Sequence, residues 1–284
     1  MSHDPDALRE LLGADAALCR RAITGEHGVS LPPFTDHHVH LHLIDESGLA
    51  AGGIAGVVDL GGDPVALARR GNHGIPRVAY AGAFLTAVGG YPVGRTWAPA
   101  EIARQIADAS THPGVAGGAA TAVDEQASFG ASVIKASLNS VAGPVLDAQA
   151  LAAIVEVARE RGLPVVAHAE GDGMPRLALD AGVDGFAHTP FTEFVGRTFT
   201  AHAVAAGQVW ISTLAIHRDD DEAAEFARVN LAGFAAAGGR VLYGTDLGNG
   251  EQPVGVNPDE VAALDRAGIR GAALISALAD PWPL

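Results

Sequence analysis

The sequence predicts an α/β protein in which eight strand-and-helix units close into a (β/α)8 barrel. Short apolar runs rich in Val, Ile and Phe alternate with alanine-rich helical stretches along most of the 284 residues. The alternation occurs eight times, as a closed barrel requires, and a doubly wound open sheet is the competing arrangement. Because 48% of the residues are hydrophobic, the chain can bury one large core, and we expect a single barrel over residues 34–284.

Residues 1–33 are expected to form an N-terminal helical extension. From residue 5 to about residue 24 the apolar side chains have the spacing of an amphipathic helix. The chain then reaches Pro32 and Pro33, which end helical structure.

The eight strands are expected at the apolar runs 34–41, 54–60, 78–85, 133–138, 164–168, 185–188, 209–214 and 241–245. A helix is expected from Asp147 to Arg161, where Leu151 and Ile154 lie on one face and Gly162 follows as a stop signal. The segment 89–99, rich in Gly and Pro, predicts a long inserted loop after the third strand.

Charge and composition narrow the possible partners. The net charge of −15 argues against nucleic acid or an anionic membrane as a partner, since both need basic surface. The single cysteine, Cys19, excludes an intramolecular disulfide and fits a reducing compartment. The acidic N-terminal residues lack the pattern of a secretory signal, and no run of 18 apolar residues occurs. These observations predict a cytoplasmic protein. We expect a small-molecule substrate as its partner, and the sequence leaves open whether the protein is a monomer or a homo-oligomer.

Lys135 is the only lysine beside 17 arginines. It lies in Ala131-Ser132-Val133-Ile134-Lys135-Ala136, which resembles a buried strand. A buried amine loses its charge readily, whereas a guanidinium does not. The lysine therefore indicates chemistry, although a lysine that extends from a strand end to solvent is an equally simple interpretation of this segment alone.

A histidine-rich run marks the end of the first strand. In Asp36-His37-His38-Val39-His40-Leu41-His42, strand alternation places residues 36, 38, 40 and 42 on one face and His37 on the other. Two imidazoles at positions i and i+2 on one face can bind one metal ion. The spacing alone leaves open whether the pair is His38 and His40 or His40 and His42.

Other strands also end on residues that can bind metals. His168 ends the fifth strand, His188 the sixth, and Asp246 follows the eighth. In a (β/α)8 barrel, the carboxyl ends of all strands meet at one mouth, where active sites are found. We therefore expect these three side chains to lie beside the histidine pair and Lys135.

This set resembles the amidohydrolase superfamily, in the binuclear branch whose fourth-strand lysine is carbamylated. The residues that carry the resemblance are Asp36, His38, His40, Lys135, His168, His188 and Gly244-Thr245-Asp246. The segments 164–168 and 177–188 are similar to imidazolonepropionase- and prolidase-like members. Many members of the family have a small β-sandwich beside the barrel, but with 33 residues before Phe34 and about 35 after Asn249 we expect little or no accompanying β-sandwich here. The resemblance spans residues 34 to about 250 and selects His38 and His40, because the family's aspartate stands two residues before the first histidine.

The resemblance implies a metal-dependent hydrolase with two divalent ions, for which zinc is the first candidate. His38, His40 and Asp246 would bind the more buried ion, His168 and His188 the other, and a carbamate on Lys135 would bridge them. A hydroxide between the metals would then attack a C–N amide, cyclic amide or dipeptide-like bond. Asp246 would transfer the proton to the leaving group, so Asp246 and Lys135 are the catalytic candidates.

Several alternatives remain at this point. They are a phosphotriesterase- or lactonase-like ester hydrolase, a decarboxylase or isomerase, and a catalytically silent metal-binding barrel. A mononuclear deaminase is disfavoured, because His168 is followed by Ala169-Glu170 and not by the H-x-x-E spacing.

The loops after the third and seventh strands supply the candidate substrate contacts. These are Tyr91 and Arg95 in the first loop and His217 and Arg218 in the second. The remaining histidines are expected to be solvated or structural: His3, His27, His73, His112 and His202.

Overall fold

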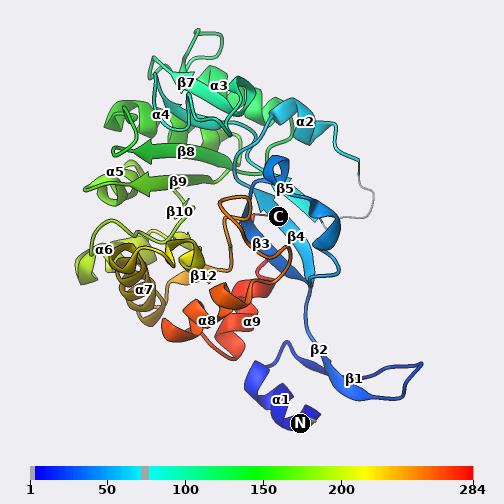
Figure 1. Ribbon diagram of the computed structural model, residues 1–284. Helices are drawn as coiled ribbons and strands as arrows, with labels where there is room; N and C mark the ends of the chain where they lie inside the picture. The colour runs from blue at the N-terminus through cyan, green and yellow to red at the C-terminus, as the bar shows by residue number, and fades with distance from the viewer. Residues whose placement is uncertain (1–3, 72–76, 284) are drawn as a thin grey trace.

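The computed structural model describes residues 4–71 and 77–283, and a ring of parallel strands forms its centre (Figure 1). One sheet has the order β12-β11-β10-β9-β8-β6-β7 and the other the order β3-β4-β5. The strands of these sheets are β3 (Phe34–Val39), β4 (Ile54–Asp59), β5 (Arg77–Tyr80), β6 (Phe84–Ala87), β7 (Ala103–Ile106), β8 (Ile134–Asn139), β9 (Val165–Glu170), β10 (Gly185–Phe186), β11 (Val209–Ile211) and β12 (Arg240–Leu242).

Hydrogen bonds between loop and strand residues close the ring at two junctions. After β12, Tyr243 accepts a hydrogen bond from His37 N (3.0 Å) and Leu247 accepts one from His40 N (2.8 Å). At the other junction β5 pairs with β4, β6 pairs with β8, and Ser132 N donates to Tyr80 O (2.9 Å). The predicted barrel is therefore confirmed, with β5 and β6 sharing the third position of the ring.

The third predicted strand differs in detail from the structure. The expected single run 78–85 is divided into β5 and β6, because Gly82 adopts a left-handed conformation (φ +74°) between them. The predicted loop 89–99 is present, but it leads into the short strand β7, which pairs with β6 and was not predicted.

Helices cover the outer face of the ring. The predicted helix after the fourth strand is confirmed as α4 (Ala148–Glu160): Asp147 caps its first turn by accepting a hydrogen bond from Ala150 N, and Leu151 and Ile154 are fully buried. The other helices of the barrel are α2 (Pro64–Ala68), α3 (Ala119–Ser128), α5 (Met174–Ala181), α6 (Gly196–Ala205), α7 (Asp221–Ala236), α8 (Pro258–Arg266) and α9 (Ala272–Ala279). Short 3-10 turns occupy Leu41–Leu43 (η1), Glu46–Gly48 (η2), Ala100–Ile102 (η3) and Leu214–His217 (η4).

The N-terminal segment is only partly helical. Helix α1 (Pro5–Leu12) ends at Gly13, whose φ is +91°, and the chain continues as a hairpin of β1 (Ala17–Arg20) and β2 (His27–Ser30). The prediction of a helix from residue 5 to about residue 24 is therefore wrong beyond Leu12. The helical spacing misled because Leu18 and Ile23 are 52% and 99% exposed and pack on no core. The hairpin lies beside the barrel (Figure 1), and the domain boundary at residues 33 and 34 stays a prediction.

No helix in the described ranges is long and apolar enough to cross a membrane.

Candidate metal centre

Six of the predicted site residues gather at the carboxyl ends of the strands. His38 lies on β3, Lys135 on β8 and His168 on β9, whereas His40, His188 and Asp246 follow β3, β10 and β12. All six are buried, and all six line one cavity of about 210 Å³. The barrel thus brings together residues that are up to 208 positions apart in the sequence (38 to 246).

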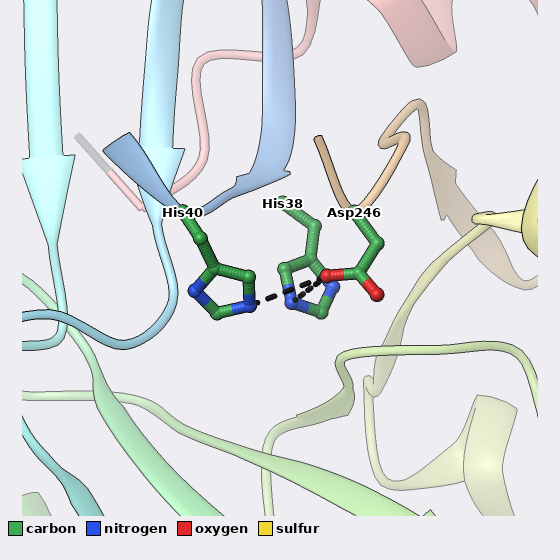
Figure 2. Close-up of side chains that lie close together, drawn as sticks. All are labelled: His38, His40 and Asp246. Carbon is green, nitrogen blue, oxygen red and sulfur yellow. Dashed lines mark ion pairs between the residues drawn. The ribbon is translucent and has the colours of Figure 1, made fainter. Parts of the chain in front are cut away.

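The most compact group of potential ligands consists of His38, His40 and Asp246 (Figure 2). Their ligand atoms lie within 4.8 Å of one another, and both Nε2 atoms are 3.2 Å from Asp246 Oδ1. His38 Nδ1 lies 2.7 Å from Ala187 O and His40 Nδ1 lies 3.0 Å from Gly61 O. Because a carbonyl oxygen only accepts, each Nδ1 carries a proton, and Nε2 is the ring atom that faces the carboxylate in both histidines.

This arrangement fits a bound cation. Burial, and then the charge of Lys135, hold the pKa of His38 well below its usual value, so a second proton on that ring is disfavoured. Burial also opposes protonation of His40, but Asp246 outweighs it and raises the pKa of that ring. Asp246 Oδ1 is buried and accepts no hydrogen bond of normal geometry. Two imidazole nitrogens and one carboxylate oxygen, all turned inward, are a typical donor set for zinc.

Asp246 lies in a closely packed segment with an unusual backbone conformation. Asp246 has a φ of +56°, and Asn249 Nδ2 donates to Asp246 Oδ2 (2.9 Å). Although burial favours the neutral acid, the adjacent histidines hold the pKa of Asp246 well below its usual value. A Cβ atom on Gly244 would lie 2.3 Å from Ile211 Cγ2 and 3.2 Å from His38 N, so only glycine allows this close approach.

Asp36 connects the segment that contains Asp246 to β3 through hydrogen bonds. Its carboxylate accepts hydrogen bonds from the backbone N–H groups of His38 (3.1 Å) and Thr245 (3.0 Å) and from the Thr245 hydroxyl. Burial raises the pKa of Asp36 to about 7. Asp36 therefore positions His38 and Asp246 relative to each other without lining the cavity.

Lys135 lies beside this group. Its Nζ is 3.3 Å from His38 Nε2 and 5.7 Å from the centre of the Phe84 ring. The side chain is 1% exposed, and burial lowers the pKa of the amine to about 7. A substantial fraction of the amine is therefore neutral, and hence nucleophilic, near neutral pH.

His168 and His188 form the opposite wall of the cavity, with ring centres 5.0 Å apart. The His188 ring lies 4.6 Å from the His38 ring, and its Nδ1 is 3.0 Å from Thr213 Oγ1. His168 Nε2 lies 3.1 Å from Glu170 Oε2. Ligation by these two histidines stays a prediction, because the compact group within the described ranges contains only His38, His40 and Asp246.

The predicted substrate contacts fall into two groups. Tyr91 lines the cavity and stacks on His168 (5.2 Å between ring centres), and His217 lines it with its Nε2 unpaired. Burial lowers the pKa of His217 to about 4, so the ring is neutral at pH 7. Arg95 is exposed, 5.8 Å from the Tyr91 ring centre, and Arg218 is exposed, with its guanidinium 3.4 Å from Glu251 O. Neither arginine lines the cavity.

The sequence interpretation missed several residues of the cavity wall: Phe84, Glu170, Phe191, Ile216 and Asn249. Glu170 carried a usable signal, because it follows His168 by two residues and strand alternation puts both on one face. The others had no such signal, since they lie in loops or on a strand chosen only for its apolar character.

Histidines outside the centre have other surroundings. His37 turns away from the cavity, and its two ring nitrogens lie 2.7 Å from Tyr243 O and 3.0 Å from Asp280 O. His42 is exposed, with its ring centre 6.1 Å from that of His40. His3 and His73 lie outside the described residues.

Comparisons with solved structures identify the fold as that of known hydrolases. The crystal structure of A. niger ochratoxinase is similar with a TM-score of 0.68 at 20% identity, over 87% of this chain and 69% of that chain. A Xaa-Pro dipeptidase with methionine bound in its active site gives 0.66 at 20% identity, over 87% and 73%. Phenylurea hydrolase B gives 0.61 at 18% identity, over 87% and 73%.

No family model matches the sequence, and no curated protein matches it either. At these identities the similarity establishes the fold. The chain thus has the α/β barrel fold of the amidohydrolases, as its strand-end residues implied.

Proposed function

We propose that the protein is a metal-dependent hydrolase of the amidohydrolase superfamily that cleaves a C–N amide bond in a small molecule. The observation that carries this proposal is the buried group of His38, His40 and Asp246, in which an unpaired carboxylate oxygen faces two Nε2 atoms. The similar structures include a Xaa-Pro dipeptidase and phenylurea hydrolase B, and these two names support the choice of a C–N bond.

The proposed centre has two ions, with zinc as the first candidate. His38, His40 and Asp246 would hold one ion, and His168 and His188 would hold the other. Lys135 would join them after its neutral amine adds carbon dioxide, which forms an N–C bond and releases one proton. A divalent pair lowers the pKa of a water molecule and polarises a carbonyl group.

Asp246 is the proposed proton carrier. Its Oδ1 faces the two histidines, whereas its Oδ2 is oriented by Asn249. Oδ2 would accept the proton of the attacking water and deliver it to the leaving nitrogen, as general acid-base catalysis requires. The low pKa of Asp246 keeps this oxygen ionised before the reaction.

The cavity wall indicates a compact substrate. Phe84, Phe191 and Ile216 supply apolar surface, and Tyr91 and His217 supply polar atoms near the histidines. A volume of about 210 Å³ suits a small or medium amide, cyclic amide or dipeptide-like group. Arg95 and Arg218 are proposed only as contacts at the exterior, since both are exposed.

A substrate panel with chelated and zinc-reloaded protein tests this function. N-acyl amino acids, dipeptides and cyclic imides are assayed beside lactones and organophosphates. We expect zinc-dependent turnover of an amide, which His40→Ala abolishes and the matched variant His42→Ala leaves intact. Preferential turnover of a lactone or organophosphate would favour the ester-hydrolase alternative, and metal binding without any turnover would favour a silent barrel.

Lys135→Ala supplies a second test of the bridge. It should remove most activity, and added short-chain carboxylic acids should restore part of it by replacing the carbamate. Turnover of this variant at the wild-type rate would contradict the role of Lys135.

A further inference from the structure

Two non-glycine residues in the described chain have a positive φ, and both lie beside the metal centre. They are Thr213 (φ +44°) and Asp246 (φ +56°). The left-handed conformation is uncommon for any residue with a Cβ atom, and for a β-branched residue it is a true outlier. Such conformations persist only where the surroundings enforce them, and they concentrate at functional sites. Thr213 has no role in the mechanism above.

The surroundings of Thr213 explain how its conformation is enforced. The residue is fully buried between β11 and η4, and its N–H donates to Gly244 O (3.0 Å) in the segment that leads to Asp246. Two residues later, Ala215 N donates to the buried carboxylate of Glu260 (2.7 Å). These hydrogen bonds fix the backbone at Thr213 and two residues beyond it.

The Thr213 side chain contacts His188. Thr213 Oγ1 lies 3.0 Å from His188 Nδ1, whereas the corresponding nitrogens of His38 and His40 contact backbone carbonyls. His188 is therefore the one of these three rings whose orientation depends on a side chain. A hydroxyl that accepts from Nδ1–H leaves Nε2 free for a metal ion and fixes the plane of the ring.

We infer that Thr213 is a positioning residue, held in a strained conformation so that its hydroxyl orients His188 toward the second metal. This inference rests on the proposed function, in which His188 is a ligand. It predicts that metal binding at the second site requires the hydroxyl group of residue 213 and does not require its methyl group. Removing such an outer partner of a ligand typically lowers metal affinity by about 10–100-fold.

Four proteins test the inference: wild type, Thr213→Val, Thr213→Ser and Thr189→Val. Valine keeps the shape of threonine and removes the hydroxyl, whereas serine keeps the hydroxyl. Thr189 is the matched control, because it follows His188 directly, is equally buried, and donates its hydroxyl to Ile211 O (3.3 Å) and not to a ligand. Apoprotein is titrated with Co²⁺ alone, and absorption of the bound ion reports stoichiometry and affinity.

We expect wild type, Thr213→Ser and Thr189→Val to bind two Co²⁺ ions with similar affinities. Thr213→Val should bind the first ion normally and the second about 10–100-fold more weakly. The inference is overturned if Thr213→Val binds both ions as wild type does, or if Thr213→Ser loses affinity to the same extent. Wild-type protein that binds no Co²⁺ would overturn the proposed function as well. A failure of the inference about Thr213 and a failure of the proposed function therefore give different results.

Discussion

The low pKa of Lys135 predicts that the free energy of unfolding of the protein depends on pH. A comparison of the wild-type protein with the variant Lys135→Met measures this dependence. Burial lowers the pKa of this amine from 10.5 to about 7 in the folded apoprotein. The difference between 10.5 and 7 corresponds to about 5 kcal/mol at 1.36 kcal/mol per pH unit, an order-of-magnitude cost of burying the charged amine at low pH. Methionine has a similar length and no charge, so the stability of the Lys135→Met variant lacks the pH dependence that the amine causes.

The sign follows from proton binding. Between pH 7 and pH 10.5 the unfolded chain keeps a proton on Lys135 that the folded chain has lost, so the folded state gains stability as the pH rises. The cost of burial falls from about 4–5 kcal/mol at pH 7 to about 2 kcal/mol at pH 9. Relative to Lys135→Met, the wild-type protein should therefore gain about 2–3 kcal/mol between these two pH values.

Urea unfolding of both chelated proteins at pH 7 and pH 9 measures this change. The buffers are free of carbon dioxide, so that the amine stays unmodified. Asp36 and Glu260, whose pKa values burial raises to about 7, titrate in both proteins and largely cancel in the difference. A stability difference between wild type and Lys135→Met that is the same at both pH values would refute the argument that burial lowers the pKa of Lys135.

Two further predictions concern the segment around Asp246. Gly244→Ala should destabilise the protein by about 1–3 kcal/mol in urea unfolding, because the new Cβ would lie 2.3 Å from Ile211 Cγ2. Gly233→Ala on α7 is its control: no atom lies within 4 Å of the added Cβ, and equal losses in both variants would contradict the steric argument. Asn249→Ala should reduce kcat by about 10-fold without changing zinc content, because only the orientation of Asp246 Oδ2 is lost. An unchanged kcat would contradict the role of Asn249 in orienting Asp246 Oδ2.

The barrel was predictable because its signals are local and repeated. Each buried strand appears as a short apolar run, and each potential ligand stands where such a run ends. The topology of a barrel then brings these ends together, so the order of residues along the chain sufficed to place His168, His188 and Asp246 at one mouth. The prediction of the helix that is confirmed as α4 depended on the same kind of local pattern, an amphipathic run followed by Gly162 as a stop signal.

The remaining features depend on contacts that no local pattern encodes. Leu18 and Ile23 have helical spacing, but they belong to a hairpin because Gly13 ends α1. Phe84 and Asn249 line the cavity through the course of particular loops and the division of the third strand. Arg218 follows His217 directly in the sequence, but it lies outside the cavity because of the turn of η4, which no local pattern encodes.

The zinc content of the reloaded protein decides whether these strand ends hold two metal ions. Chelated protein is reloaded with Zn²⁺, dialysed and analysed for zinc per chain. We expect two zinc ions per chain in the wild-type protein. The variant His188→Ala should retain one zinc ion, because His38, His40 and Asp246 can still bind it. Wild-type protein that retains one zinc ion or none after this treatment would contradict the two-metal centre.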